Sequence, residues 1–108
     1  MKRVVVTGLG IVSCIGNDQD SITNSLKNLK SGISSAKEYE EYSFRSLVHG
    51  KPDVDINEKI DRRLLRFMGD GAAYNYIAMK DAIEDSGLEV NDISNEMTGI
   101  IVGSGGPS

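Results

Sequence analysis

Apolar residues form one long run near each end of the chain and three helical patterns between them. Residues 3–13 make up the first run and residues 98–102 the last, and both are rich in β-branched side chains. Such residues favour strands, and nearly continuous apolar runs are typical of strands covered on both faces, as in parallel sheets. The pattern therefore predicts two buried strands, the first of them central in its sheet.

An amphipathic helix is predicted after the first strand. Asn17 or Asp18 can cap its start, because either side chain can accept a hydrogen bond from a free backbone N–H of the first turn. Gly32 is placed to end it. Its apolar positions recur at helical spacing, at Ile22, Leu26 and Leu29. We expect this face to pack against the rest of the protein.

The following segment, residues 34–46, is polar and mixed in charge, which predicts an irregular excursion before a short strand at 47–50. Its large anchoring side chains are Tyr39, Tyr42 and Phe44.

Two further helices are predicted, a short one at 58–67 and a long one at 72–86. Gly69 and Gly71 favour a break between them, and Gly87 is placed to end the second. Apolar residues of the long helix cover more than one stripe, which predicts burial on most sides.

The order strand, helix, excursion, helices, strand predicts an α/β layer with a parallel sheet. A last apolar strand without neighbours would leave an exposed sheet edge, which invites aggregation. We therefore expect residues 1–108 to be a truncated N-terminal portion of a larger domain.

Composition narrows the class of protein. With 39% hydrophobic and 26% charged residues, the 108-residue chain resembles an ordinary soluble domain. A net charge of −4 argues against general nucleic-acid binding, so any basic patch is local. The single cysteine, Cys14, cannot form an internal disulfide, which favours the cytoplasm.

The first residues have the outline of a secretory leader, since Met1, Lys2 and Arg3 precede an apolar run. Glycines and β-branched residues interrupt that outline and favour the strand. Residues 11–14 also resemble a lipoprotein cleavage site, a less favoured alternative. No apolar segment is long enough to predict a membrane span.

Several motifs together resemble the opening part of the β-ketoacyl-acyl-carrier-protein synthases. The motifs that carry the resemblance are residues 4–13, Ile15-Gly16, Ser31-Gly32-Ile33 and Gly103-Ser104-Gly105-Gly106, and those that favour the type I class are Ser13-Cys14-Ile15-Gly16, Arg45-Ser46 and residues 60–68. The resemblance covers essentially the whole chain. It implies a thiolase-like fold with a mixed, largely parallel sheet between helices, a homodimer, and fatty-acid elongation by decarboxylative Claisen condensation, with no cofactor or metal.

In that family a cysteine holds the acyl group and two histidines support decarboxylation and the oxyanion. Neither that cysteine nor those two histidines are expected in this chain. Cys14 lies in or after the first strand, where a small buried hydrophobe is the favoured interpretation. His49 is the single histidine, and we expect it at the surface or at a strand end. The chain therefore contains no predicted catalytic residue.

A local basic face is the predicted binding feature. Helical spacing allows three arginines to share an exposed side, with Lys59 beside them: Arg62, Arg63 and Arg66. The resemblance matches these positions to residues that dock the acidic acyl carrier protein. The alternative is a solvated helix face neutralised by Glu58 and Asp61.

Three glycines are the second candidate site: Gly103, Gly105 and Gly106. By the resemblance they lie near the acyl-chain pocket and the dimer interface, where Gly106 would leave room for a growing chain. A tight turn after a strand explains them equally well. Pro107 stands where the family pattern has a glycine or small residue.

Other functions remain open. Gly8-Leu9-Gly10 after a strand suggests a dinucleotide-binding turn, although Ser13 replaces the third glycine. Residues 53–57 hint at a calcium loop, but Glu58 stands in place of its glycine and Leu64 in place of its closing glutamate, so no calcium site is predicted. A non-catalytic module that binds carrier protein is a further alternative.

Overall fold

The computed structural model describes residues 2–106, which form two compact units, one of residues 2–11 with 55–106 and one of residues 12–54. The helices and strands of this part of the chain are α1 (Gln19–Lys27), β1 (Ser34–Ser35), α2 (Lys37–Glu41), β2 (Val48–His49), α3 (Ile56–Lys59), α4 (Arg62–Leu65), α5 (Asp70–Ser86) and α6 (Val90–Ile93). None of the helices in 2–106 is both long and apolar enough to cross a bilayer.

Helix α5 is the centre of the first unit, and the N-terminal segment packs directly on it through Gly8 and Gly10. A Cβ atom on Gly10 would lie 2.6 Å from the Ala82 amide nitrogen and would overlap the Ala78 carbonyl oxygen. A Cβ on Gly8 would likewise overlap the Ala82 carbonyl oxygen and lie 2.7 Å from the Ser86 nitrogen. The backbone of the segment therefore touches the backbone of the helix, which only glycine permits.

The distance between the two glycines along the extended segment matches the rise of about one turn of α5. Two residues of extended chain cover ~6.6 Å, and four residues of α-helix cover ~6.0 Å. Residues two apart in an extended segment also face the same side. Gly8 and Gly10 thus meet successive turns of α5, and the Leu9 N–H between them donates to the Asp85 carboxylate at 2.9 Å. The structure assigns Gly8-Leu9-Gly10 to helix packing rather than to a dinucleotide-binding turn.

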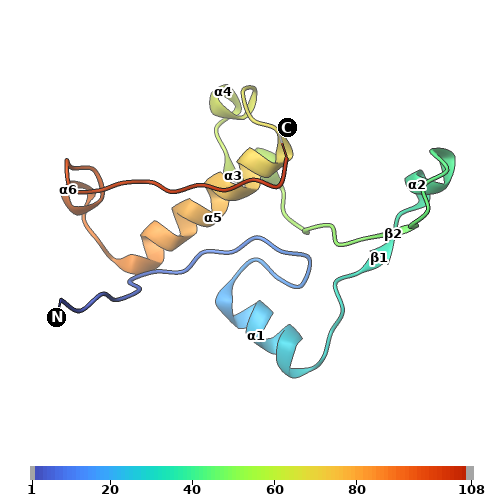
Figure 1. The fold of residues 1–108 in the computed structure, drawn as a ribbon, viewed down its shortest axis with the longest axis horizontal. Coiled ribbons are helices and arrows are strands. Elements are labelled where there is room, and N and C mark those ends of the chain that lie inside the picture. The colour runs from blue at the N-terminus through green and yellow to red at the C-terminus, as the bar shows by residue number, and fades with distance from the viewer. Residues whose placement is uncertain (1, 107–108) are drawn as a thin grey trace. The chain divides into compact units, whose positions relative to one another are not determined.

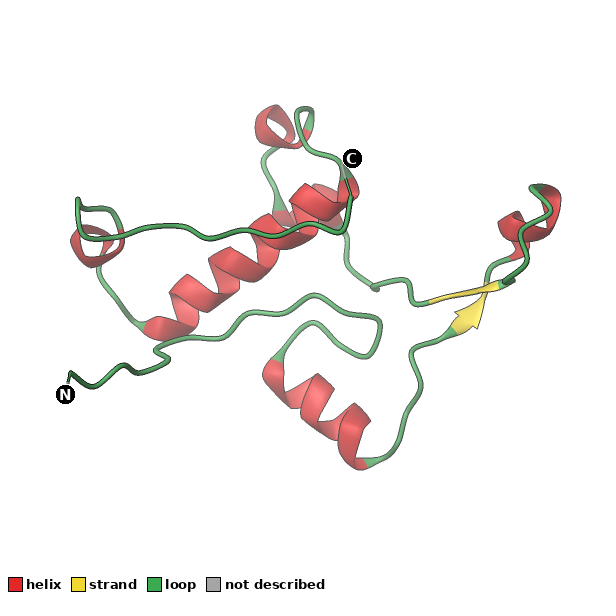
Figure 2. Ribbon diagram, viewed as in Figure 1, coloured by secondary structure: helices red, strands yellow, loops and turns green. Residues whose placement is uncertain are grey.

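The predicted parallel sheet does not form within residues 2–106. The predicted strands at 3–13 and 98–102 are drawn as loop in Figure 2, and the sheet that is present pairs β1 with β2 in antiparallel order. Ile101 is 98% exposed instead of buried. A strand requires a hydrogen-bonded neighbour, and an apolar pattern specifies strand propensity without specifying that neighbour.

Both end segments nevertheless run along α5 (Figure 1). The order of the contacts, Gly8 against Ser86 and Gly10 against Ala78, sets the N-terminal segment antiparallel to the helix. Residues 100–106 also lie against α5 and run past it in the same direction, towards its N-terminal end (Figure 1). The two segments are thus parallel to each other, although no strand ladder joins them in the described chain.

Helix α5 begins and ends close to the predicted places. Gly69 is its N-cap, and Gly87 ends it with a φ of 64°, a left-handed conformation that glycine adopts at little cost. Its burial is smaller than predicted. Ala73 and Ile77 are buried, with Ile60 from the turn before α4, whereas Met79 and Tyr76 are partly exposed.

The prediction of a single helix at 58–67 is wrong, because two short helices, α3 and α4, form there instead. Asp55 caps α3 by accepting from the Asn57 N–H at 2.8 Å, and Asp61 caps α4 by accepting from the Arg63 N–H at 2.7 Å. Ile60 between them has an extended backbone and is buried. The second aspartate cap restarts the helix, since it satisfies the N–H groups that a new first turn leaves free.

In the second unit, Asp18 caps α1 as predicted. Its carboxylate accepts from the Ser21 N–H at 2.8 Å, and the hydrogen bonds from the Ser21 backbone and hydroxyl lower the pKa of the Asp18 carboxyl. Only part of the predicted apolar face is packed, since Ile22 is half-buried. Ser25 is buried, with its hydroxyl donating to the Ile15 carbonyl at 2.7 Å, while Leu26 and Leu29 are exposed.

Helix α1 ends at Lys27, before Gly32, and Leu29 completes its C-terminal motif. The Leu29 N–H donates to the Leu26 carbonyl at 3.2 Å and the Lys30 N–H to the Ser25 carbonyl at 2.8 Å, the bond pattern of a Schellman motif. Leu29 therefore occupies the position that glycine usually takes, with a φ of 53°. Gly32 packs against Cys14 instead.

Substitution Leu29→Gly is expected to raise the free energy of unfolding by about 0.5–1 kcal/mol. It relieves the left-handed strain of a side chain that is 92% exposed, and the larger entropy of unfolded glycine offsets part of the gain. Urea unfolding gives the change. Leu29→Ala is the control, because alanine keeps the Cβ and its strain, and an equal gain from alanine would contradict the explanation.

The short strand predicted at 47–50 is confirmed as β2, but the excursion before it is more regular than predicted. Residues 34–35 form β1, which pairs with β2 in the register Ser34 to His49 and Ser35 to Val48, and α2 lies in the connection. The predicted anchors cluster: Tyr39 contacts the Phe44 ring edge-on at 5.1 Å, and Tyr42 lies 6.0 Å from Phe44. His49 lies at the strand end, as predicted.

Candidate functional site

The three predicted arginines lie on α4 and at its end. Arg62 and Arg63 belong to the helix, and Arg66 is its C-cap residue, with an N–H that donates to the Arg62 carbonyl at 3.4 Å. All three side chains are exposed. Because the helix is fixed by the Asp61 cap and packs against α3, the arginines project from a defined backbone.

The carboxylates predicted to neutralise these arginines are not paired with them. In the described part of the chain, Lys80 pairs with Glu84 at 3.9 Å and His49 Nδ1 lies 3.7 Å from a Glu38 carboxylate oxygen, and no arginine forms an ion pair. Asp61 directs its carboxylate at the Arg63 backbone N–H. With respect to residues 2–106, the guanidinium groups therefore keep their hydrogen-bond donors available. We call Arg62, Arg63 and Arg66 the arginine face.

Arg66 differs from the other two arginines in having an aromatic neighbour. Its guanidinium carbon lies 4.6 Å from the centroid of the Phe67 ring, within the range of a cation–π contact. Sequence reasoning missed this contact, and its signal was an aromatic residue directly after an exposed arginine.

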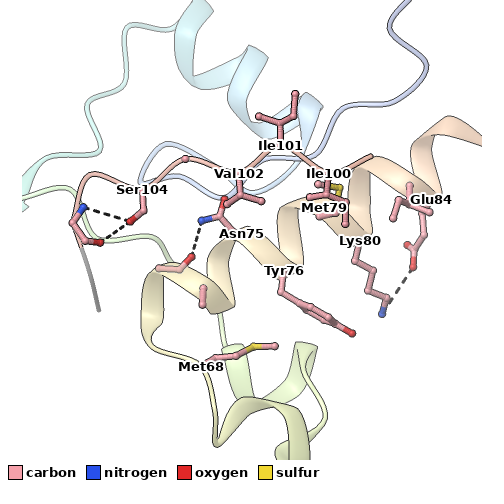
Figure 3. A pocket seen from close by; sticks show the side chains of 15 residues that line it. Met68, Asn75, Tyr76, Met79, Lys80, Glu84, Ile100, Ile101, Val102 and Ser104 are labelled. Atoms are coloured by element: carbon pink, nitrogen blue, oxygen red, sulfur yellow. Dashed lines mark hydrogen bonds and ion pairs between the residues drawn. The ribbon is translucent and has the colours of Figure 1, made fainter. Parts of the chain in front are cut away.

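An open hollow of about 920 Å³ lies along α5, and we call it the apolar trough. Side chains of α5 form one wall, residues 100–104 pass along the other side, and Met68 lies at the end towards α4 (Figure 3). Tyr76 and Met79 line it, with Lys80 and its partner Glu84 at the opposite end. Clefts of 300–1,000 Å³ with mostly apolar walls are typical of small-ligand sites.

Two of the three predicted glycines line the trough, Gly103 and Gly106, whereas Gly105 does not. A Cβ atom at any of the three would meet nothing within 4 Å, so close approach does not require glycine here. The Ser104 hydroxyl donates to the Gly106 carbonyl at 2.6 Å, which bends the chain locally. Pro107, also singled out from the sequence, lies outside the described residues.

Met68 of the apolar trough follows Arg66 of the arginine face by two residues in the sequence, and no residue of the arginine face lines the trough. Cys14 and His49 are both packed against neighbouring residues of the second unit. Cys14 is half-buried, where a Cβ on Gly50 would lie 3.0 Å from its sulfur, and His49 packs edge-on to Tyr39 at 5.7 Å. Within 2–106, no three His, Cys, Asp or Glu residues are grouped to hold a metal ion.

Comparison with known proteins identifies a family. The sequence profile described as "Beta-ketoacyl synthase, N-terminal domain" matches residues 1–107, which is nearly the whole chain.

Individual relatives agree with the profile. The chain is 48% identical over 105 residues to 3-oxoacyl-acyl-carrier-protein synthase 1 of Haemophilus influenzae, a match that covers 97% of this chain and 26% of the relative. It is 44% identical over 109 residues to synthase 1 of Escherichia coli, covering 100% of this chain and 27% of that protein. Identity to synthase 2 of Vibrio harveyi is 32% over 105 residues, covering 96% and 25%. The chain spans about a quarter of these relatives.

Proposed function

This chain belongs to the β-ketoacyl synthase family, as part of its N-terminal domain, and from that membership we propose that it serves fatty-acid elongation. The proposed reaction is decarboxylative Claisen condensation of malonyl-acyl-carrier protein with a cysteine-bound acyl group. The relatives' name supports it, because a 3-oxoacyl product forms when the α-carbon of the malonyl group bonds to the acyl carbonyl carbon, while CO2 and the cysteine thiolate leave.

We propose that the part of this chain in that reaction is to dock the carrier protein, while a cysteine and two histidines elsewhere in the enzyme carry out the chemistry. The observation that supports docking is the arginine face, whose three exposed guanidinium groups form no ion pair with a carboxylate of residues 2–106. Arginine forks bind carboxylates in pairs of parallel hydrogen bonds, and positive potential speeds encounter with an acidic partner. The rest of the chain is acidic, with a net charge of −4 overall, so an acidic partner is attracted to the arginine face and repelled elsewhere.

The finer features of the fold are part of the same proposal. We propose that segments 3–13 and 98–102 become neighbouring strands of a parallel sheet in a thiolase-like domain, since both run antiparallel to α5. Gly103, Gly105 and Gly106 would then follow the second strand and border the acyl chain or a homodimer contact. The cytoplasm is the proposed location.

Substitution Arg63→Ala with Arg66→Ala tests the docking proposal in the polypeptide that carries this chain. We expect the affinity for acyl carrier protein to fall about tenfold, because two charge-assisted contacts of ~0.7 kcal/mol each are lost. The dependence of affinity on salt should flatten, since fewer charges remain to be screened. Titration calorimetry at several salt concentrations measures both quantities.

A charge-matched control separates docking from bulk electrostatics. Lys27→Ala with Lys30→Ala removes the same two charges from exposed positions at the end of α1. We expect carrier affinity to stay within twofold of the unaltered protein. Equal losses in the two double variants would refute a localised arginine face.

A carrier-binding module without condensing activity is the second candidate function. One observation favours it: the whole arginine face lies within the unit that contains α4 and α5. No catalytic residue is predicted in that unit. Condensation assays distinguish the two, because a module of this kind binds carrier protein without producing a 3-oxoacyl chain.

A further inference from the structure

Phe67 is 79% exposed, although it is a large aromatic side chain. Its backbone is nevertheless fixed, because its N–H donates to the Leu64 carbonyl at 3.1 Å and the next N–H, of Met68, donates to the Leu65 carbonyl at 2.9 Å. The ring therefore projects from an ordered turn at the end of α4. It contributes little to the core of the described residues.

The contact that Phe67 makes is with Arg66, whose guanidinium carbon lies 4.6 Å from the ring centroid. Sequence neighbours inside a helix do not face each other. Here they do, because Arg66 is the last residue of the helical turn and Phe67 lies beyond it. The arginine side chain folds across the ring in place of extending freely into water.

The geometry of the guanidinium group decides what such a stack leaves available. The group is planar, with its N–H donors along the edge and none on the flat faces. A ring that covers one face therefore removes no donor. It also restricts the rotamers of a long side chain, so less conformational entropy is lost when the edge binds a partner.

We propose that Phe67 is a positioning residue for carrier docking, which holds the Arg66 guanidinium by its face so that the edge binds a carboxylate of the acidic carrier protein. The inference rests on the proposed function, since it concerns the same arginine face. Charge complementarity selects an acidic occupant, because the ring lies against Arg66 of the arginine face, and no carboxylate of residues 2–106 forms an ion pair with that face. The exposed ring also adds an apolar contact beside a charged residue, as aromatic anchors do in many interfaces.

A double-mutant cycle between Phe67→Leu and Arg66→Ala tests the coupling, with carrier affinity measured by titration calorimetry. Leucine keeps an apolar side chain but has no ring face. We expect Phe67→Leu to weaken binding about two- to fivefold when Arg66 is present, the affinity equivalent of an exposed cation–π contact, and by less than half as much in the Arg66→Ala background. Phe67→Tyr keeps the ring and should bind within twofold of the unaltered protein.

The outcomes separate this inference from the docking proposal. Loss of affinity in Arg63→Ala with Arg66→Ala, combined with no effect of Phe67→Leu, would overturn the role of Phe67 alone. The same conclusion follows if Phe67→Leu has equal effects with and without Arg66, or if it lowers the melting temperature, because the ring would then act as a separate contact or as a structural residue. If the arginine variants themselves bind carrier normally, the docking proposal fails and this inference with it.

Discussion

Replacement of Gly10 by alanine is expected to lower the free energy of unfolding by about 3 kcal/mol. The new Cβ would overlap the Ala78 carbonyl oxygen and lie 2.6 Å from the Ala82 amide nitrogen, both backbone atoms of α5. A side chain can rotate away from such an overlap, but a helix backbone cannot. The N-terminal segment must therefore separate from the helix, with loss of the hydrogen bond from the Leu9 N–H to Asp85.

Urea unfolding of the polypeptide that carries the chain measures this loss. Gly105→Ala and Gly71→Ala are matched controls, since a Cβ at either position meets nothing within 4 Å. Gly105→Ala should leave stability nearly unchanged, and Gly71→Ala, inside α5, should raise it by about 0.5–1 kcal/mol. A similar midpoint for Gly10→Ala and the controls would show that the segment does not pack on α5 as described.

Gly16→Ala should destabilise the second unit by about 2–3 kcal/mol, for two separable reasons. Gly16 has a φ of 151°, a conformation that residues with a Cβ seldom adopt, and its Cβ would overlap the Ser21 hydroxyl and lie 3.0 Å from Ile22. The residue also closes a turn in which its N–H donates to the Ser13 carbonyl at 3.4 Å and its carbonyl accepts from the Ser13 N–H at 3.2 Å.

Gly87→Ala isolates the backbone part of this effect. Gly87 has a φ of 64°, but a Cβ there would meet nothing within 4 Å. We expect a loss of about 1 kcal/mol for Gly87→Ala, and the excess for Gly16→Ala measures the steric part. Equal losses in thermal or urea unfolding would mean that the space around Gly16 is not limiting.

Features determined by neighbouring residues were predictable from the sequence. The Asp18 cap, the end of α5 at Gly87 and the strand around Val48 each depend on a few adjacent residues, and the structure confirms them. The restart of the helix at Asp61 follows the same rule and was missed, because the apolar pattern of residues 58–67 is continuous across it. The end of α1 was misplaced because Leu29 takes a conformation that its type disfavours.

Features that depend on distant residues were not predictable in the same way. A Gly-x-Gly pair signals close backbone approach, but the sequence does not say to what, and the partner, α5, begins sixty residues after Gly10 in the chain. Exposure of Phe67 and its stack on Arg66 depend on side-chain conformation at the end of a four-residue helix. The positions of the arginines were predictable, whereas the residue that orients one of them was not.

The glycine pair also limits how the N-terminal segment can be aligned with the helix. A shift by one residue would place Leu9 where the backbone of α5 leaves no room for a side chain. A shift by two residues would keep one glycine in contact but place Val6 or Val12 at the other site. The two glycines thus fix the alignment of the segment on α5, because both adjacent alignments would place a side chain against the helix backbone.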